Sequence, residues 1–336
     1  MMRGSLKSFW LARMARLYPV YLLGMLMFVP FIYRDTNASV IERVTTGLLT
    51  LVAGQAWPRG FGWQWGMWNP PGWSLSAEAF FYLVFPFVSV SLSRWSTRGL
   101  LIFALGCWAV SMLATVQYAV TGSADRELWM FFPLMRLPEF LIGVAAGIVW
   151  KNRASSAFDE LAPHAAVFSS ISLIAVMSLS IKEEWYFNGV VAPLAAVLIC
   201  SLACNRGLVA RILSCRPLVV LGGASFSLYI LHWPIWLVAQ HVFGRSVIYR
   251  MQPNLYFVAY FACATAASYV CFKYVEEPMN KLLRKRFLSG QSRDLATDTD
   301  KHAHREQPQA SPVAANVYGS EAVGSSSQIA LMRDEF

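Results

Sequence analysis

The sequence predicts an all-α integral membrane protein, a bundle of about eight transmembrane helices with both termini in the cytoplasm. Of its 336 residues 56% are hydrophobic and only 14% are charged, whereas soluble domains carry about 25% charged residues. Apolar runs close to the 20 residues that cross a bilayer recur along the chain. We expect spans at about 15–33, 76–93, 99–120, 128–150, 165–181, 187–204, 218–243 and 254–275.

Lys and Arg residues predict the orientation of these spans. With the N-terminus inside, the segments on the cytoplasmic side carry sixteen Lys and Arg residues, against seven on the opposite side. Cytoplasmic loops of membrane proteins are enriched in these residues. An even number of spans then returns the chain to the cytoplasm.

Two stretches do not fit the spanning pattern. Residues 41–57 are apolar but contain Glu42, Arg43 and several Thr, so we expect an extracytoplasmic loop that lies along the interface. Residues 287–336 are polar and have no periodic apolar face, which predicts a disordered cytoplasmic tail. The membrane domain therefore covers residues 1–286.

Composition also excludes several classes of partner. The net charge is +9, but there is no nucleic-acid-binding motif, and the basic clusters between apolar runs indicate topology signals and attraction to lipid headgroups. We expect no nucleic acid partner. The six cysteines have no metal-ligand spacing and predict neither a metal site nor a disulfide framework. Gly143 and Gly147 are spaced for close helix packing.

Four ionisable residues lie inside predicted spans, where a charge costs at least about 2.5–3.5 kcal/mol. Glu78 is near the outer end of the second span. Arg136 and Glu139 share one face of the fourth span, and His232 is midway along the seventh. One interpretation is structural: Arg136 pairs with Glu139 or with Glu78 and only orders the bundle. The other is a functional cavity.

The surroundings of His232 favour the functional interpretation. An isolated histidine in a span is more often a satisfied core residue, but Ser225, Ser227 and Tyr229 share this helix. They predict a polar cavity, in which a neutral imidazole can act as a general base near pH 7.

Arg13 and Arg16 lie one turn apart at the predicted cytoplasmic mouth of the first span. They anchor the span by positive charge, or they form a fork for phosphate groups, which guanidinium binds through paired hydrogen bonds. Their spacing does not choose between these two interpretations.

Four blocks in order resemble acyltransferase family 3, integral membrane proteins that include polysaccharide O-acetyltransferases. The blocks are the Arg-x-x-Arg segment in Phe9–Pro19, Trp73-Ser74-Leu75-Ser76-Ala77-Glu78, Arg136-Leu137-Pro138-Glu139-Phe140-Leu141-Ile142-Gly143, and Ser225–Trp233, in which Phe226 replaces a Tyr. The end, Tyr274-Val275-Glu276-Glu277-Pro278, is also similar, and the match extends over roughly residues 6–286.

The resemblance implies transfer of an acyl group, usually acetyl, from cytoplasmic acyl-CoA to a hydroxyl of an extracytoplasmic or lipid-linked glycan. No bound cofactor is implied, because acyl-CoA is a co-substrate. The partners are then membrane lipid, acyl-CoA and the glycan, and the location is the bacterial inner (plasma) membrane. In this scheme Glu78 and His232 are catalytic, and Arg13 and Arg16 bind acyl-CoA. The acceptor cavity is lined by Trp73, Ser74, Arg136, Glu139, Ser225, Ser227 and Tyr229.

Family members usually begin with two further helices, which carry an Arg and, eleven positions on, the His thought to deprotonate the acceptor. Residue 1 of this sequence follows both positions, so we expect residues 1–336 alone to transfer little or no acyl group. An upstream start codon or a truncated gene is the preferred explanation. The alternatives to an enzyme are a transporter or flippase of a glycan or lipid-linked substrate, and a catalytically inactive, truncated membrane protein.

Overall fold

The structure is a computed structural model. It describes residues 6–34, 38–57, 68–121, 130–153, 155–179, 189, 191–204, 206–250 and 253–286. The chain divides into two units, Met1–Ser289 and Gly290–Phe336, and every described residue belongs to the first. The predicted tail, residues 287–336, lies outside the described residues.

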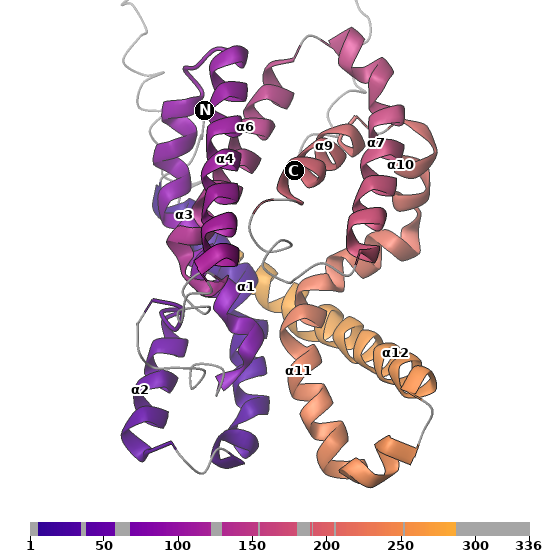
Figure 1. Ribbon diagram of the computed structural model, residues 1–336. Helices are drawn as coiled ribbons and strands as arrows, with labels where there is room; N and C mark the ends of the chain where they lie inside the picture. The colour runs from indigo at the N-terminus through magenta and orange to yellow at the C-terminus, as the bar shows by residue number, and fades with distance from the viewer. Residues whose placement is uncertain are drawn as a thin grey trace, which may run out of the picture. The chain divides into compact units, whose positions relative to one another are not determined.

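The predicted all-α fold is confirmed, since the described residues contain helices and no strand (Figure 1). The helices are α1 (Leu6–Phe28), η1 (Val29–Arg34), α2 (Val40–Leu51), η3 (Pro70–Gly72), α3 (Trp73–Leu92), α4 (Thr97–Thr121), α6 (Pro133–Asn152), α7 (Ser155–Ser178), α9 (Ala192–Leu202), α10 (Gly207–Leu213), α11 (Arg216–Arg250), α12 (Pro253–Cys271) and the π-helical η4 (Phe272–Glu276). Residues 277–286 continue η4 as α-helix.

Seven helical segments in the described chain are long and apolar enough to cross a membrane. They match seven of the predicted spans. The remaining one, 187–204, contains α9, whereas α10 follows it. These two helices are bent by 85° relative to each other and make an eighth span only if they are counted together. The cytoplasmic placement of both termini stays a prediction.

The first span begins earlier than predicted, because its helix starts at Leu6 rather than near residue 15. Arg13 and Arg16 therefore lie within α1, about 10 and 15 Å along its axis at 1.5 Å per residue. That they lie at the cytoplasmic mouth of the span stays a prediction. Both arginine side chains project from the middle of α1 and not from a loop before it.

The loop predicted for residues 41–57 is largely a helix, α2. Ser39 and Glu42 form a capping box: the Ser39 hydroxyl accepts from the Glu42 N–H at 3.2 Å, and a Glu42 carboxylate oxygen accepts from the Ser39 N–H at 2.7 Å. Thr46 and Thr50 are buried while Ile41 is exposed. A helix that buries threonine and exposes aliphatic side chains is suited to a lipid environment rather than to water.

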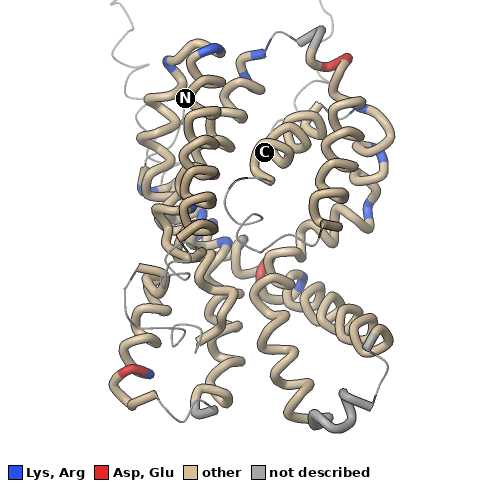
Figure 2. Tube along the Cα trace, in the orientation of Figure 1, with Lys and Arg blue, Asp and Glu red and all other residues tan. Residues whose placement is uncertain are grey.

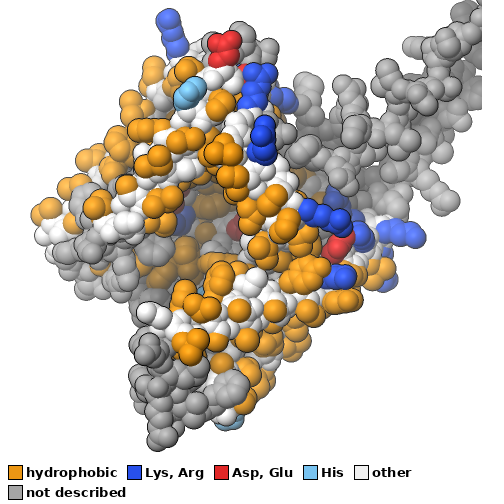
Figure 3. All heavy atoms as spheres, turned by 90° about the vertical axis from the view of Figure 1, so that its right-hand side faces the viewer, with side chains coloured by type: hydrophobic (Ala, Val, Ile, Leu, Met, Phe, Trp, Pro, Cys, Tyr) orange, Lys and Arg blue, Asp and Glu red, His pale blue; other side chains and the backbone are white. Residues whose placement is uncertain are grey.

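Apolar side chains cover much of the outer surface, as expected where lipid is the solvent. Figure 2 shows helices that are almost entirely uncharged, and Figure 3 shows apolar side chains over much of the face that it draws. Gly143 and Gly147 also face outward, and a Cβ atom at either position would meet nothing within 4 Å. The predicted close packing through these glycines is wrong within this chain, because α6 buries Val144 and Ala145 instead.

The core that positions the candidate site joins four elements distant in sequence. Tyr21 and its neighbours on α1 pack with Leu75 of α3, with Ile230 of α11 and with Cys271 at the end of α12. Consequently the basic turn of α1, the start of α3 and the middle of α11 are held in a fixed arrangement.

Candidate active site

The segment before α3 is fixed between α1 and α11 by buried side chains. The Asn69 side-chain amide, 2% exposed, donates to the Ile230 carbonyl at 3.0 Å. Gln55 donates to the Gly72 carbonyl. A Cβ atom at Gly72 would lie 3.2 Å from the Tyr21 ring, so a residue without a side chain allows this close approach. These contacts determine where the Trp73–Glu78 block enters the bundle.

Ser74 and Tyr229 meet at the first turn of α3. Each hydroxyl donates to the Pro71 carbonyl at 3.1 Å, so the two side chains share one acceptor. The charge of Glu78 acts on Tyr229 as well. The structure thus brings together three predicted site residues from α3 and α11.

His232 lies one turn beyond Tyr229, with the two ring centroids 6.1 Å apart. Its Nδ1 is 2.7 Å from the Tyr229 carbonyl oxygen. Because a carbonyl only accepts, Nδ1 carries the proton, and in the neutral ring Nε2 keeps its lone pair. Glu78 and His232 form no hydrogen bond with each other, and Tyr229 interacts with both. This tautomer leaves a nitrogen able to accept a proton.

Tyr82 connects Glu78 to the arginines of α1, and the sequence interpretation missed it. The Tyr82 hydroxyl donates to Oε1 of Glu78. The guanidinium carbon of Arg13 lies 5.4 Å from the Tyr82 ring centroid, and the charges of Arg13 and Arg16 both act on Tyr82. The available signal was its spacing of four residues from Glu78, which places both on one helix face.

The two serines predicted for the cavity point in different directions. Ser225 is exposed and donates to the Gly222 carbonyl at 2.7 Å. Ser227 is fully buried, and its hydroxyl donates to Oε2 of Glu276 at 2.6 Å. At 100° per residue, Ser227 lies nearly opposite the face that Ser225, Tyr229 and His232 share. The structure therefore separates Ser227 from the other residues of its block.

Glu276 is the second residue that the sequence interpretation did not assign. It is 4% exposed, ends the π-helical η4, and lies within electrostatic reach of Arg16. π-Helical turns inside α-helices are frequent at functional sites. The motif around Glu276 was visible in the sequence, but its partner Ser227 is distant in the chain.

Arg136 and Glu139 form a separate cluster on α6. Nη1 of Arg136 lies 3.3 Å from Oε1 of Glu139, with the side chains 6% and 26% exposed. Gly189 lies close enough to act on Glu139, and its carbonyl accepts from the Trp108 indole at 3.0 Å. The pair predicted by the structural interpretation is therefore present. The Trp73 ring packs against the ring of Phe131, which lies just before α6, with the two ring centroids 5.0 Å apart.

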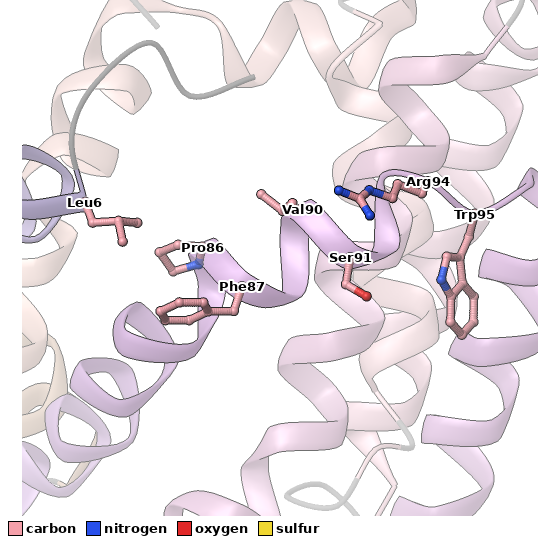
Figure 4. Close-up of a pocket in the computed structure, with 7 residues that line it drawn as sticks. All are labelled: Leu6, Pro86, Phe87, Val90, Ser91, Arg94 and Trp95. Carbon is pink, nitrogen blue, oxygen red and sulfur yellow. The ribbon is translucent and has the colours of Figure 1, made fainter.

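Two hollows lie near the site but contain none of the predicted catalytic or donor residues. One, of about 630 Å³, lies beyond Tyr82 toward the end of α3, where Pro86, Phe87 and Val90 form apolar walls near Arg94 (Figure 4). The other, of about 300 Å³, lies between α1 and α2 and is lined only by apolar side chains and Gly47. Among the described residues, no three His, Cys, Asp or Glu side chains gather closely enough to hold a metal ion.

Comparison with known proteins matches this chain to one protein family and to several relatives. A family model described as an acyltransferase domain matches residues 2–273. The chain is 25% identical over 233 residues to an O-acetyltransferase, OatA, of Staphylococcus aureus, which covers 64% of this chain and 36% of that protein. It is 25% identical over 336 residues to the acyltransferase MdmB of Streptomyces mycarofaciens (88% of this chain, 80% of MdmB).

A third relative is the peptidoglycan O-acetyltransferase OatA of Listeria monocytogenes, 24% identical over 299 residues, or 82% of this chain and 47% of that protein. The chain thus spans about a third to a half of the length of the two OatA proteins. No solved structure matches it.

Proposed function

The chain belongs to acyltransferase family 3, and from this premise we propose that it transfers an acetyl group from acetyl-CoA to a hydroxyl of a glycan. The observation that carries the proposal is a continuous series of polar groups through the bundle. It runs from Arg13 through Tyr82 to Glu78, and from there to Tyr229 and His232. Donor-binding and proton-accepting groups are thus adjacent, as acyl transfer requires.

In the proposed reaction, Arg13 and Arg16 bind the phosphates of CoA, since guanidinium matches phosphate through paired hydrogen bonds. The acceptor hydroxyl attacks the thioester carbonyl, so that a C–O bond forms and the C–S bond breaks. The hydroxyl proton passes to a base, and CoA leaves as the thiolate that this proton finally neutralises. Among the described residues, Nε2 of His232 and the carboxylate of Glu78 are the groups placed to accept it.

The names of the relatives support the choice of acceptor in this proposal. Two of them are O-acetyltransferases, and the name of the Listeria protein specifies peptidoglycan. We therefore propose a glycan at the extracytoplasmic side of the bacterial inner membrane as acceptor, reached through the part of the site that contains Ser74 and Tyr229.

The test is acetyl transfer in reconstituted vesicles supplied with labelled acetyl-CoA and a peptidoglycan-derived acceptor. It is run on residues 1–336 and on a form extended by any reading frame that precedes Met1. We expect Arg13→Gln with Arg16→Gln to abolish donor binding, and Arg98→Gln, an exposed position outside the site, to leave it unchanged. If neither form releases CoA or yields acetylated product, the enzyme proposal is wrong.

A transporter is the second candidate, and the 85° bend between α9 and α10 is the observation that favours it. Transporters bind substrates at broken helices, which usually occur as a pair in two repeats. Glycan counterflow in the same vesicles, without acetylation, would support this function over the enzyme.

A further inference from the structure

Tyr82 is in contact with both halves of the proposed reaction site, although neither the family blocks nor the sequence patterns assign it a role. It lies on α3 four residues after Glu78, hence on the same helix face. Its hydroxyl donates a hydrogen bond to Oε1 of Glu78. The hydroxyl thus restrains one oxygen of the carboxylate that we propose as a proton acceptor.

The ring of the same side chain faces the donor-binding part of the site. The Arg13 guanidinium lies 5.4 Å from the ring centroids of both Tyr82 and Phe9. A cation over an aromatic face is attracted by the ring quadrupole. The two rings therefore hold Arg13 between them and direct its guanidinium.

Residue Tyr82 contacts α1 through both its backbone carbonyl and its ring. The Trp10 indole donates to the Tyr82 carbonyl at 2.9 Å. The Phe9 ring meets the Tyr82 ring edge-on at 6.2 Å between centroids. The ring contacts with Phe9 and Arg13 and the hydrogen bond to Glu78 restrain the rotation of the Tyr82 side chain, so a displacement of Arg13 is expected to move the hydroxyl beside Glu78.

We infer that Tyr82 is a positioning residue that couples donor binding at Arg13 to the orientation of the Glu78 carboxylate. The inference rests on the proposed function, because it takes Arg13 as a ligand of acyl-CoA. The ring sets the guanidinium that binds the phosphates, and the hydroxyl sets the carboxylate beside the reacting thioester. The two functions belong to different atoms of one side chain, so different substitutions separate them.

Tyr82→Phe keeps the ring under Arg13 and removes only the hydrogen bond to Glu78. The variants are made in whichever form of the chain transfers acetyl groups, residues 1–336 or the form extended upstream of Met1. We expect the affinity of Tyr82→Phe for CoA to stay within twofold of that parent and its kcat for acetyl transfer to fall about tenfold or more. Tyr82→Leu removes the ring as well. We expect its CoA affinity to fall by a further factor of roughly two to five, in line with the strength of an exposed cation–π contact. Tyr269→Phe, a partly exposed tyrosine of α12, is the matched control.

A spectroscopic measurement tests the hydrogen bond without turnover. In infrared difference spectra of the full chain, Tyr82→Phe should shift a carboxylate stretching band, and the shift should vanish in a Glu78→Gln background. A purely structural role predicts that kcat, CoA affinity and thermal stability fall together in Tyr82→Phe. That result, or an unshifted carboxylate band, would overturn the inference.

The control with the parent protein separates this inference from the proposed function. A parent chain that binds no CoA contradicts the proposed donor, and with it the premise of the coupling. A parent that binds CoA and transfers acetyl groups, combined with a Tyr82→Phe variant of unchanged kcat, contradicts the coupling alone.

Discussion

The Glu78 region and the Arg136 region both place charges inside the bundle, but they satisfy those charges differently. Around Glu78 the partners come from α1, α3 and α11, and Tyr229 remains 39% exposed. In the Arg136 region the two charges lie three residues apart on one helix, at 3.3 Å, with Arg136 almost completely buried. In the Glu78 region the partners come from several elements, whereas in the Arg136 region the two opposite charges belong to one helix.

This difference separates two roles that the sequence could not distinguish. A buried charge is tolerated when a nearby opposite charge and hydrogen bonds compensate it, which describes Arg136 and Glu139. A polar group that is to act on a substrate must remain accessible, which describes Tyr229 and the partly exposed His232. We therefore assign chemistry to the Glu78 region and mainly a structural role to the Arg136 pair.

The largest expected effect comes from Glu78→Gln, which removes a proton acceptor while keeping the side-chain shape. Acetyl transfer should fall about 10²- to 10⁴-fold, the range of general acid–base contributions, with little change in thermal unfolding. The comparison is Glu139→Gln, which should lower stability more than rate. Transfer assays and unfolding in detergent measure the two quantities. A large rate loss in Glu139→Gln at unchanged stability would contradict the division into two roles.

The second-largest expected effect is a loss of stability when the Arg136–Glu139 pair is broken. Arg136→Met leaves the Glu139 carboxylate buried without its partner and should destabilise the protein by about 3–5 kcal/mol. The double variant Arg136→Met/Glu139→Gln should recover most of that loss, because no uncompensated charge remains. Denaturant unfolding in detergent gives the values. A double variant as unstable as the single one would show that Arg136 has a role besides pairing.

The sequence predicted those features that depend on short-range periodicity. Seven apolar spans were found because each is a continuous run, and Glu139 was one of the two partners predicted for Arg136, because residues three apart share a helix face. The helix α2 was missed because its Thr and charged residues were interpreted as loop signals. Its capping box, Ser39 with Glu42, was nevertheless present in the sequence and is a recognised helix start.

The tertiary part of the site could not be predicted from one sequence. Ser227 and Glu276 are 49 residues apart, and Asn69 and Ile230 are 161 apart, so no local pattern relates them. The helical angle between Ser225 and Ser227 was available and already places them on different faces. Grouping them in one cavity ignored that angle.

Glu276→Gln gives a smaller effect and tests whether the active region extends to η4. The substitution replaces a charged acceptor of the Ser227 hydroxyl by a neutral one and removes a charge that acts on Arg16. We expect a loss of about 1.5–3 kcal/mol in stability, the range for hydrogen bonds to charged groups, together with a change in CoA affinity. Ligand titration and unfolding measure both.

The matched control for Glu276 is its neighbour Glu277→Gln. Glu277 pairs with Lys281 at 2.6 Å on the surface, where ion pairs contribute about 0–1 kcal/mol. The Glu277→Gln substitution should therefore leave the affinity for CoA unchanged. Equal effects of the two substitutions would place Glu276 outside the functional region and limit that region to α1, α3 and α11.

The smallest expected effect lies outside both regions and provides a baseline for the comparison. Ser39→Ala removes the N-cap of α2 and should cost about 1 kcal/mol of stability, with acetyl transfer unchanged. The hydrogen bonds from Ser39 hold the pKa of Glu42 below its ordinary value of 4.5. The ionised form is thus favoured by folding, so this stabilisation is present at neutral pH and is lost as the pH falls through that lowered pKa. The stability difference between the parent and Ser39→Ala should shrink at acid pH, where the Ser39 hydroxyl no longer donates to an ionised carboxylate, but should not vanish, because the Glu42 N–H still donates to that hydroxyl. A difference that does not change with pH would contradict the capping box as its source.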